Sequence, residues 1–181
     1  MAQPGGGALG GAGRASASGS RYRARGRPQA NALWWSEQIK AGDVVRGAYG
    51  HLKTAPIHED DIAAVAVHAL TEDGHAGRRY TLTGPEVLTL AEQVRVIGEA
   101  IGRPLRWQEL TREEERARLL ADPGFPDGFV DELLDGYARM AAAPAPAVTA
   151  TVPGITGAAA TPLSRWAAEH AAGFGGGPRR E

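Results

Sequence analysis

The 181-residue sequence contains no cysteine and no long apolar run. Without cysteine, the chain has no disulfide, no thiolate metal ligand and no cysteine nucleophile. No apolar run approaches the roughly 20 residues that a membrane-spanning helix needs. The composition, with 43% hydrophobic and 23% charged residues, is ordinary for a globular domain. These features predict a soluble, cytoplasmic protein with one folded domain and no membrane partner.

Acidic residues are absent from residues 1–30, which contain eight glycines and five arginines. Large apolar side chains are almost absent there too, so folding would not offset the lost conformational entropy. We predict a disordered Gly/Ala/Arg-rich tail at 1–30, a folded part at 31–174 and a second tail at 175–181. The alternatives for the first tail are a misassigned start and an organellar transit peptide, which the missing amphipathic period disfavours.

The charge of the folded part disfavours nucleic acid as a partner. Residues 31–181 carry the remaining 15 basic and all 21 acidic residues, a net charge of about −6. Phosphate backbones bind to clustered Lys and Arg side chains, which this part lacks. Residues 21–27 (RYRARGR) are basic and could hold RNA weakly, with Tyr22 stacking on a base. A solvated tail is the simpler interpretation.

Residues 54–90 have the pattern of one α/β crossover unit. A short extended stretch at 54–57 leads into a helix that begins with Asp60 and Asp61, where the helix dipole favours carboxylates. Apolar residues at helical spacing then form a single stripe: Ile62, Val65, Ala66, Ala69 and Leu70. Two glycines interrupt the pattern, and residues 79–82 return as a strand.

Capping patterns mark the helices that follow. Thr89 and Glu92 have the S/T-x-x-E spacing in front of a helix at 90–101, and Thr111 and Glu114 repeat it before a helix at 112–121. The remaining predicted elements are a strand at 105–110, helices at 32–41, at 129–140 and after Pro162, and a small hairpin from 44 to 54 that turns at 47–50.

Three segments of the chain resemble one known family: PIHEDDIAAVAVHAL, GHAGRRYTLTGPEVLT and AIGRPLRWQEL. They are similar to the C-terminal half of NmrA-like NAD(P)-binding proteins, an atypical branch of the short-chain dehydrogenase/reductase superfamily. The resemblance covers about residues 31–174. It implies an α/β fold, namely the C-terminal, substrate-side portion of a Rossmann-like NAD(P)-binding fold that lacks most of the parallel sheet.

The resemblance implies NAD(P) as cofactor, yet the half of the family fold that holds the dinucleotide is missing. Gly7, Gly10 and Gly13 imitate a phosphate-binding glycine pattern. They follow no buried strand and open no helix, so the dipole that would hold a phosphate is absent. We therefore expect no dinucleotide to bind this chain alone, and the cofactor-binding residues stay unknown.

A second imitation concerns catalysis. Ser36, Tyr49 and Lys53 have the spacing of the superfamily triad, in which Lys lies one helical turn after the Tyr acid/base. Gly47 and Gly50 bracket the tyrosine and disfavour a helix by about 1 kcal/mol each. The flanks instead indicate a hairpin. We therefore predict no catalytic residue in this chain.

Four residues are candidates for lining a substrate pocket: Trp34, Trp35, Tyr49 and His58. The resemblance implies that the helix carrying both tryptophans borders the pocket, with a place in the core as the alternative. His58 and Asp61 form a polar pair at a strand-to-helix corner, where a hydrogen-bonded structural role comes first and a pocket role second. Third and fourth ligands at suitable spacing are missing, so no metal site is predicted.

Three functional hypotheses follow from the missing half. The chain is the C-terminal portion of an NAD(P)-dependent oxidoreductase or redox sensor, an interaction module that completes a separate Rossmann half, or an inactive truncated product. A parallel sheet buries both faces, so without it the apolar stripes of the helices at 62–70 and 90–101 would face water. This predicts binding to a Rossmann-half partner or self-association.

Overall fold

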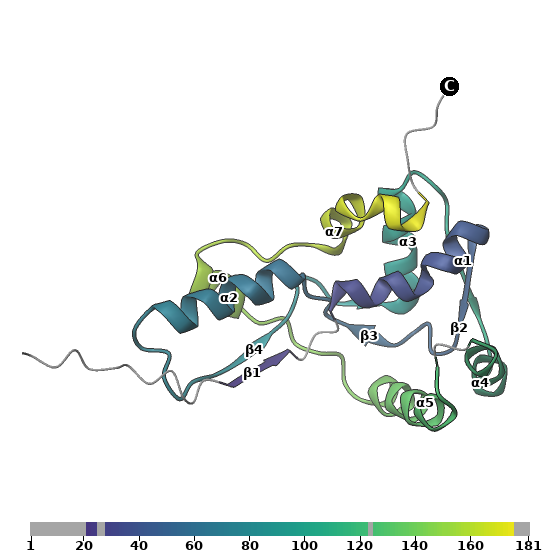
Figure 1. Cartoon of the computed structure of the whole chain (residues 1–181), viewed down its shortest axis with the longest axis horizontal. Coiled ribbons are helices and arrows are strands. Elements are labelled where there is room, and N and C mark those ends of the chain that lie inside the picture. Colours follow the sequence, from purple (N-terminus) through teal and green to yellow (C-terminus); the bar gives the residue numbers. More distant parts are fainter. Residues whose placement is uncertain (1–20, 25–27, 123–124, 176–181) are drawn as a thin grey trace, which may run out of the picture.

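The computed structural model describes residues 21–24, 28–122 and 125–175 and has an α/β architecture (Figure 1). Its strands form three pairs within those residues. Two pairs are parallel and one is antiparallel: β1 (Arg21–Ala24) with β4 (Arg79–Leu82), β2 (Val44–Gly47) with β6 (Arg106–Glu109), and β3 (Lys53–Thr54) with β5 (Leu88–Thr89). The predicted α/β class is therefore confirmed. Parallel pairing in the described part of the chain consists of these two short pairs and one isolated bridge between Pro28 and Ile57.

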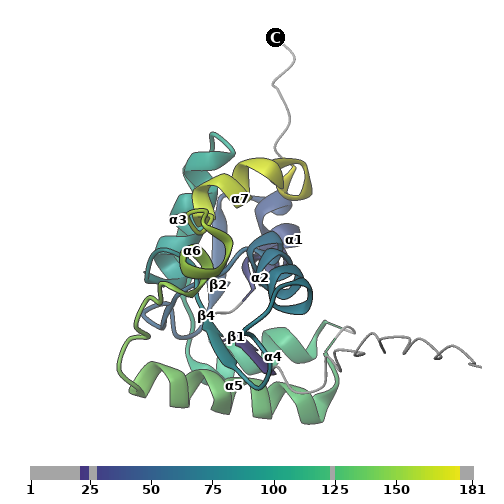
Figure 2. The ribbon, with the colours of Figure 1, turned by 90° about the vertical axis from the view of Figure 1, so that its left-hand side faces the viewer.

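Helices flank these strand pairs (Figures 1 and 2). In chain order they are η1 (Gln29–Trp35), α1 (Ser36–Ala41), α2 (Glu59–Thr71), α3 (Leu90–Ala100), α4 (Arg112–Leu120), α5 (Asp127–Ala142), α6 (Thr151–Thr156), α7 (Leu163–Glu169) and η2 (Ala171–Phe174). The predicted helix at 32–41 is thus a 3₁₀ turn followed by a short α-helix. No helix among the described residues has the length and apolarity needed to cross a membrane.

Both predicted capping boxes are present. The Thr89 hydroxyl accepts from the Glu92 amide at 3.1 Å, and the Glu92 carboxylate accepts from the Thr89 amide at 2.8 Å. Thr111 and Glu114 make the same reciprocal pair at the start of α4. Each box satisfies two backbone donors that a helix N-terminus otherwise leaves open, so the sequence fixes where α3 and α4 begin.

The predicted end of the first tail at residue 30 is wrong. Arg21–Ala24 forms β1, and the side chain of Gln29 is buried. The Gln29 amide donates to the carbonyl oxygens of Pro56 and Thr161, at 3.2 and 3.1 Å. Composition did not reveal this strand because its partner β4 lies far along the chain. Residues 1–20 and 25–27 of the predicted tail, including Gly7, Gly10 and Gly13, lie outside the described residues, as do residues 176–181 of the second tail.

The predicted hairpin from 44 to 54 is also wrong. Strand β2 pairs in parallel with β6, and β3 pairs with β5. The turn between β2 and β3 is present, since the Leu52 amide donates to the Tyr49 carbonyl at 2.8 Å. Tyr49 has a φ of 61°, in the left-handed region that non-glycine residues seldom adopt. The chain therefore turns where predicted, but each strand finds a partner from further along the sequence.

The main apolar core lies between α3, α7 and α1. Val94 and Ile97 of α3 are fully buried with Ile39, Trp166 and Phe174. Figure 1 shows α7 running across α3. The expectation that the stripe of this helix faces water is therefore wrong, because the C-terminal helix covers it.

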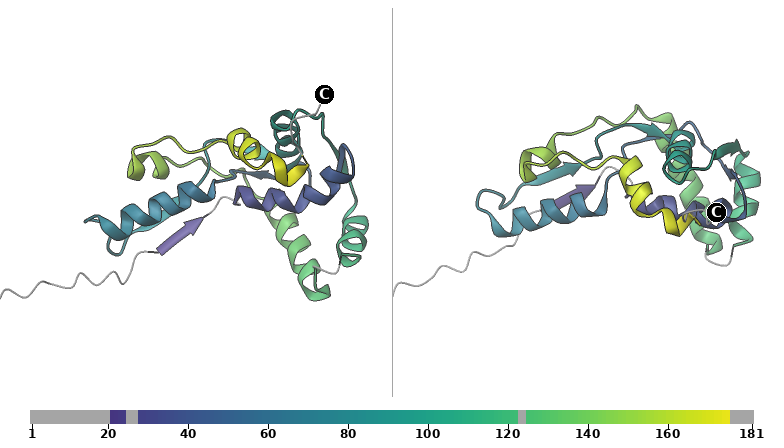
Figure 3. Two further views of the ribbon diagram at one scale, coloured as in Figure 1. Left: turned by 45° about the horizontal axis from the view of Figure 1, so that its top comes forward. Right: turned by 90° about the horizontal axis from the view of Figure 1, so that it is seen from above.

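A second cluster covers the crossover helix α2. Val65 packs with Ile57, Leu82 and Val152 and is fully buried. Val152 belongs to α6, a helix that the sequence did not predict. Figure 3 shows α2, β1, β4 and α6 together at one end of the molecule. The stripe is covered at Val65, whereas Leu70 at its end is 61% exposed, as expected for an uncovered helix.

The helices α4 and α5 form a separate pair below the rest of the molecule (Figures 1 and 2). Leu119 of α4 and Val130 and Leu134 of α5 make a small buried cluster, with Tyr49 packed against it. Ion pairs link Arg112 to Asp135 and Arg116 to Asp131, at 2.6 and 2.7 Å. This arrangement places the α4–α5 pair opposite η1 and the start of α3.

Candidate substrate-binding cavity

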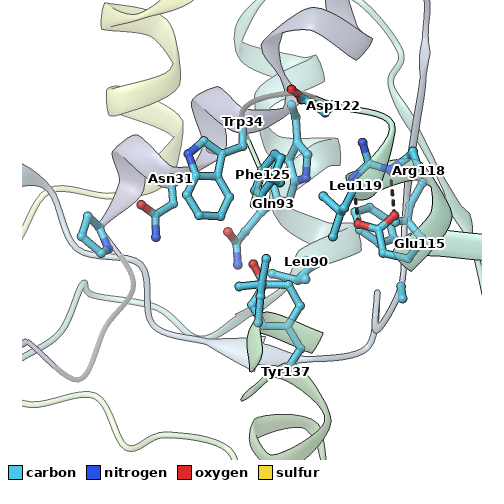
Figure 4. A pocket seen from close by; sticks show the side chains of 17 residues that line it. Asn31, Trp34, Leu90, Gln93, Glu115, Arg118, Leu119, Asp122, Phe125 and Tyr137 are labelled. Atoms are coloured by element: carbon cyan, nitrogen blue, oxygen red, sulfur yellow. Dashed lines mark hydrogen bonds and ion pairs between the residues drawn. The ribbon is translucent and has the colours of Figure 1, made fainter. Parts of the chain in front are cut away.

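A cavity lies between the α4–α5 pair and the rest of the fold (Figure 4). One side consists of η1, the end of β2 and the first turn of α3, which includes Leu90 and Gln93. The other side consists of α4, α5 and the residues between them. Figure 4 shows Trp34 and the Arg118–Glu115 pair on opposite sides, with Tyr137 below. Elements that are distant in sequence therefore meet at one hollow.

Five aromatic side chains make much of the wall: Trp34, Trp35, Trp107, Phe125 and Tyr137. Trp35 meets Trp107 edge to face, with ring centroids 6.0 Å apart, and Trp34 meets Phe125 in the same way at 5.8 Å. Such pairs hold each other's orientation while their remaining surfaces stay available to a ligand. A cavity with these walls suits flat, conjugated molecules.

Three polar residues of the cavity, Glu115, Arg118 and Gln93, are tied to partners in the protein. Glu115 is 6% exposed and receives two hydrogen bonds from Arg118, both at 2.7 Å. Donating these hydrogen bonds to the Glu115 carboxylate raises the pKa of Arg118 above its ordinary value. Gln93 is buried, and its amide donates to the Thr54 hydroxyl at 2.8 Å. The Arg118 charge is thus neutralised locally by Glu115, and Gln93 is fixed in orientation.

The turn after β2 supplies a further part of the wall through Gly47 and Ala48. Trp107 lies directly against this turn. A Cβ atom at Gly47 would lie 2.6 Å from Cη2 of Trp107, and one at Gly50 would lie 2.3 Å from Nε1 of the same indole. Since real Cβ atoms do not approach other atoms so closely, both positions need glycine for the indole to pack here.

Two of the four predicted pocket residues line this cavity. Trp35 lies in its wall, and Trp34 lies at its edge with 51% of its surface exposed. Tyr49 and His58 are not among the lining residues. Tyr49 packs against the α4–α5 cluster, and its hydrogen bond raises the pKa of Arg112. That Trp34 and Trp35 bind a substrate stays a prediction.

His58 forms the hydrogen-bonded corner that the sequence indicates, but with other partners. Its Nδ1 accepts from the Asp60 amide at 3.0 Å, and its Nε2 lies 3.2 Å from the Glu169 carboxylate. Asp61 instead accepts from the amide and the hydroxyl of Thr161, at 2.7 and 3.0 Å. Hydrogen bonds from Arg165 and then His58 lower the pKa of Glu169. The corner fastens α2 to α7.

The triad imitation does not form a catalytic arrangement. Ser36 begins α1, Tyr49 lies in a turn, and Lys53 lies in β3. Lys53 is therefore not one helical turn after Tyr49, which agrees with the predicted turn. The described residues also contain no group of three His, Cys, Asp or Glu side chains placed to hold a metal ion.

Sequence reasoning missed most of the cavity wall. Glu115 and Arg118 fall in the helix predicted at 112–121, and Trp107 falls in the strand predicted at 105–110, without any indication of a pocket. The local signal at Glu115 and Arg118 was the i, i+3 spacing of opposite charges, which is common on surface helices. The cavity exists because six elements converge, namely η1, β2, α3, β6, α4 and α5, which come from separate parts of the sequence.

No family model matches the chain. Individual proteins do match it. The chain is 39% identical over 144 residues to the (4-alkanoyl-5-oxo-2,5-dihydrofuran-3-yl)methyl phosphate reductase of Streptomyces griseus. It is 34% identical over 145 residues to the NAD(P)H azoreductase of Xenophilus azovorans. Each match covers 80% of this chain and 50% of the relative.

A solved structure gives the same result. The NADPH-dependent quinone oxidoreductase QOR2 of Escherichia coli, in complex with NADPH, superposes with a TM-score of 0.69 at 26% identity. The match covers 80% of this chain and 51% of that one. The chain therefore resembles NmrA-like NAD(P)-binding proteins, as its sequence motifs predict. It spans about half the length of the relatives it matches and corresponds to the C-terminal portion of these oxidoreductases.

Two strand-to-helix connections among the described residues lack the features that hold a pyrophosphate. A pyrophosphate needs a glycine-rich loop between a strand and a helix N-terminus. Here β3 reaches α2 through residues 55–58 (APIH), and β6 reaches α4 through Leu110 and Thr111. Helix α2 moreover begins with the carboxylates of Glu59, Asp60 and Asp61, which would repel a phosphate.

Proposed function

We propose that this chain supplies the acceptor-binding portion of an NAD(P)H-dependent reductase. The observation that carries the proposal is the cavity walled by Trp34, Trp35, Trp107, Phe125 and Tyr137. Its substrate is a flat conjugated acceptor such as a quinone, which gains binding energy by stacking on aromatic walls. The names of an azoreductase and a quinone oxidoreductase among the relatives support this class.

The dinucleotide binds to a separate Rossmann half in this proposal. Strand β1 is paired on one side, with β4, and forms an edge of its sheet within the described residues. Such an edge offers backbone donors and acceptors to a further parallel strand. The NAD(P)H-binding half adds at β1, which brings the nicotinamide toward η1 and the cavity. The chain alone binds an acceptor but performs no reduction.

The first experiment measures both ligands on the purified chain. We expect 1,4-naphthoquinone to quench tryptophan fluorescence with saturation, since three tryptophans line the cavity. Trp35→Ala should weaken that binding about tenfold, as expected for the loss of one stacking partner. Val67→Ala, on the exposed face of α2, is the matched control and should bind as the parent chain does.

Calorimetry with NADPH should show no binding at concentrations that saturate an intact relative. A micromolar dissociation constant for NADPH would contradict the proposal that the dinucleotide binds to a separate half. Absence of saturable naphthoquinone binding would contradict the acceptor site. Co-expression with the dinucleotide-binding half of a relative should then restore NADPH-dependent quinone reduction.

A further inference from the structure

Glu109 is an exposed residue of β6 that contacts two of the segments that form the cavity wall. Its carboxylate accepts a hydrogen bond from Nε1 of Trp107 at 2.6 Å. It also accepts from the backbone amide of Gly50, at 3.0 and 3.2 Å to its two oxygens. Glu109 is not itself one of the lining residues, whereas Trp107 and Gly47 are. One carboxylate therefore joins strand β6 to the turn that follows β2.

The Trp107 indole is held on three sides. The glycine turn lies against one face, where no side chain larger than hydrogen fits at Gly47 or Gly50. The Trp35 ring meets the indole at 77°. The Glu109 carboxylate binds the one polar atom of the ring. The hydrogen bond adds a directional constraint at Nε1 to the packing of the ring against Trp35 and the glycine turn.

We propose that Glu109 is a positioning residue that sets the width of the cavity and with it the preference for flat over propeller-shaped ligands. The inference rests on the acceptor site proposed above. With Glu109 in place, the wall formed by Trp107 and Trp35 is rigid, and a flat two-ring quinone stacks on it. Without Glu109, the indole turns away from the Gly47–Gly50 turn, the cavity widens, and a triarylmethane dye enters more easily.

The test compares two probes, 1,4-naphthoquinone and a triphenylmethane dye, by tryptophan quenching on the full chain. The measured quantity is the ratio of their dissociation constants. Glu109→Ala should shift this ratio at least tenfold toward the dye. Glu109→Gln keeps the size of the side chain and one acceptor oxygen, and should shift it about threefold. Glu132→Ala, which removes the same charge from an exposed position on α5, should leave the ratio unchanged.

A double-mutant cycle separates positioning from general stability. Trp107→Phe removes the nitrogen that Glu109 holds, so Glu109→Ala should have no further effect on the ratio in that background. A merely structural role would weaken both probes alike in each background and lower the melting temperature. If Glu109→Ala does not fold, Glu109→Gln and the same cycle built on it give the answer.

An unchanged ratio in folded Glu109→Ala and Glu109→Gln overturns the role of Glu109 and leaves the acceptor site standing. The same shift in the Trp107→Phe background also overturns it, because the effect would then not pass through the indole. Failure of both probes to bind the parent chain overturns the acceptor site and this inference together.

Discussion

Gly84 shows how closely two backbone segments approach each other beside the crossover unit. A Cβ atom at this position would lie 1.8 Å from the carbonyl oxygen of Pro56. The Gly84 amide donates to the Ala55 carbonyl at 3.3 Å. The loop after β4 can therefore approach residues 55–57 only because Gly84 has no side chain. Residues 55–57 lead into α2 and its N-cap at His58.

We expect Gly84→Ala to destabilise the fold by about 3 kcal/mol, because neither backbone can move away without losing hydrogen bonds. Gly136→Ala on α5 is the control. Its nearest neighbour would be a guanidinium nitrogen of Arg139 at 3.9 Å, so the substitution is free of overlap. It should stabilise the protein by about 0.5 to 1 kcal/mol through helix propensity. Urea denaturation of both variants measures the difference, and equal midpoints would contradict the close approach.

At the scale of elements, helix α3 connects the core with the cavity. Its capping box at Thr89 and Glu92 begins the helix, Gln93 lies in the cavity wall, and Val94 and Ile97 enter the main core. A shift of the first turn would move the wall and the core together. The box therefore affects both stability and the geometry of the proposed acceptor site.

The pH dependence of α3 follows from Glu92. Hydrogen bonds from the Thr89 amide and hydroxyl lower its pKa from the ordinary 4.5. A carboxylate with a lower pKa in the folded state stabilises the fold above pH 4.5 and loses that contribution as the pH falls through the folded pKa. Glu92→Gln should therefore show a smaller loss of melting temperature between about pH 5 and pH 3 than the parent.

The control for this prediction is Glu132→Gln on the exposed side of α5. It should retain the full acid-induced loss of melting temperature. Thermal melts monitored by circular dichroism at several pH values give both curves. Parallel curves for Glu92→Gln and the parent chain would show that the box contributes nothing to acid stability.

At the scale of the whole molecule, segments far apart in sequence are joined by buried or partly buried polar contacts. Gln29 bridges to Pro56 and Thr161, and Asp61 binds Thr161 from the opposite side. Thr149 donates through its amide and hydroxyl to Thr83 and to the Thr81 carbonyl, each at 2.9 Å. These contacts fasten the segment leading to α6 and α7 over the crossover unit, so the helices can cover its apolar faces.

Deletion of residues 1–30 tests how much β1 and Gln29 contribute to the stability of the fold. It removes β1 and the buried amide of Gln29, so the carbonyl oxygens of Pro56 and Thr161 lose their donor. Relative to a chain lacking only residues 1–20, the melting temperature should fall by roughly 5 to 10 °C. Equal melting temperatures for the two deletions would show that β1 and Gln29 contribute nothing to stability.

The sequence by itself determined the local features of this protein. The capping boxes at Thr89 and Thr111, the acidic start of α2 and the turn at Tyr49 each depend on residues within one or two helical turns. Amphipathic spacing predicted which of the longer segments are helices, and the family resemblance predicted the fold class. Short-range hydrogen bonding and side-chain periodicity are present in any window of the chain, so these predictions needed no knowledge of the fold.

Tertiary structure alone decided the pairing of strands and the composition of the cavity. The β2–β6 pairing replaced a predicted hairpin, β1 formed on a strand more than fifty residues away, and α6 covered a stripe expected to be open. Trp34 and Trp35 were predicted for the cavity, but Trp107 and Glu115 join them only when β6 and α4 fold back onto η1. Parallel pairing and side-chain convergence depend on contacts across the whole chain, which local patterns do not encode.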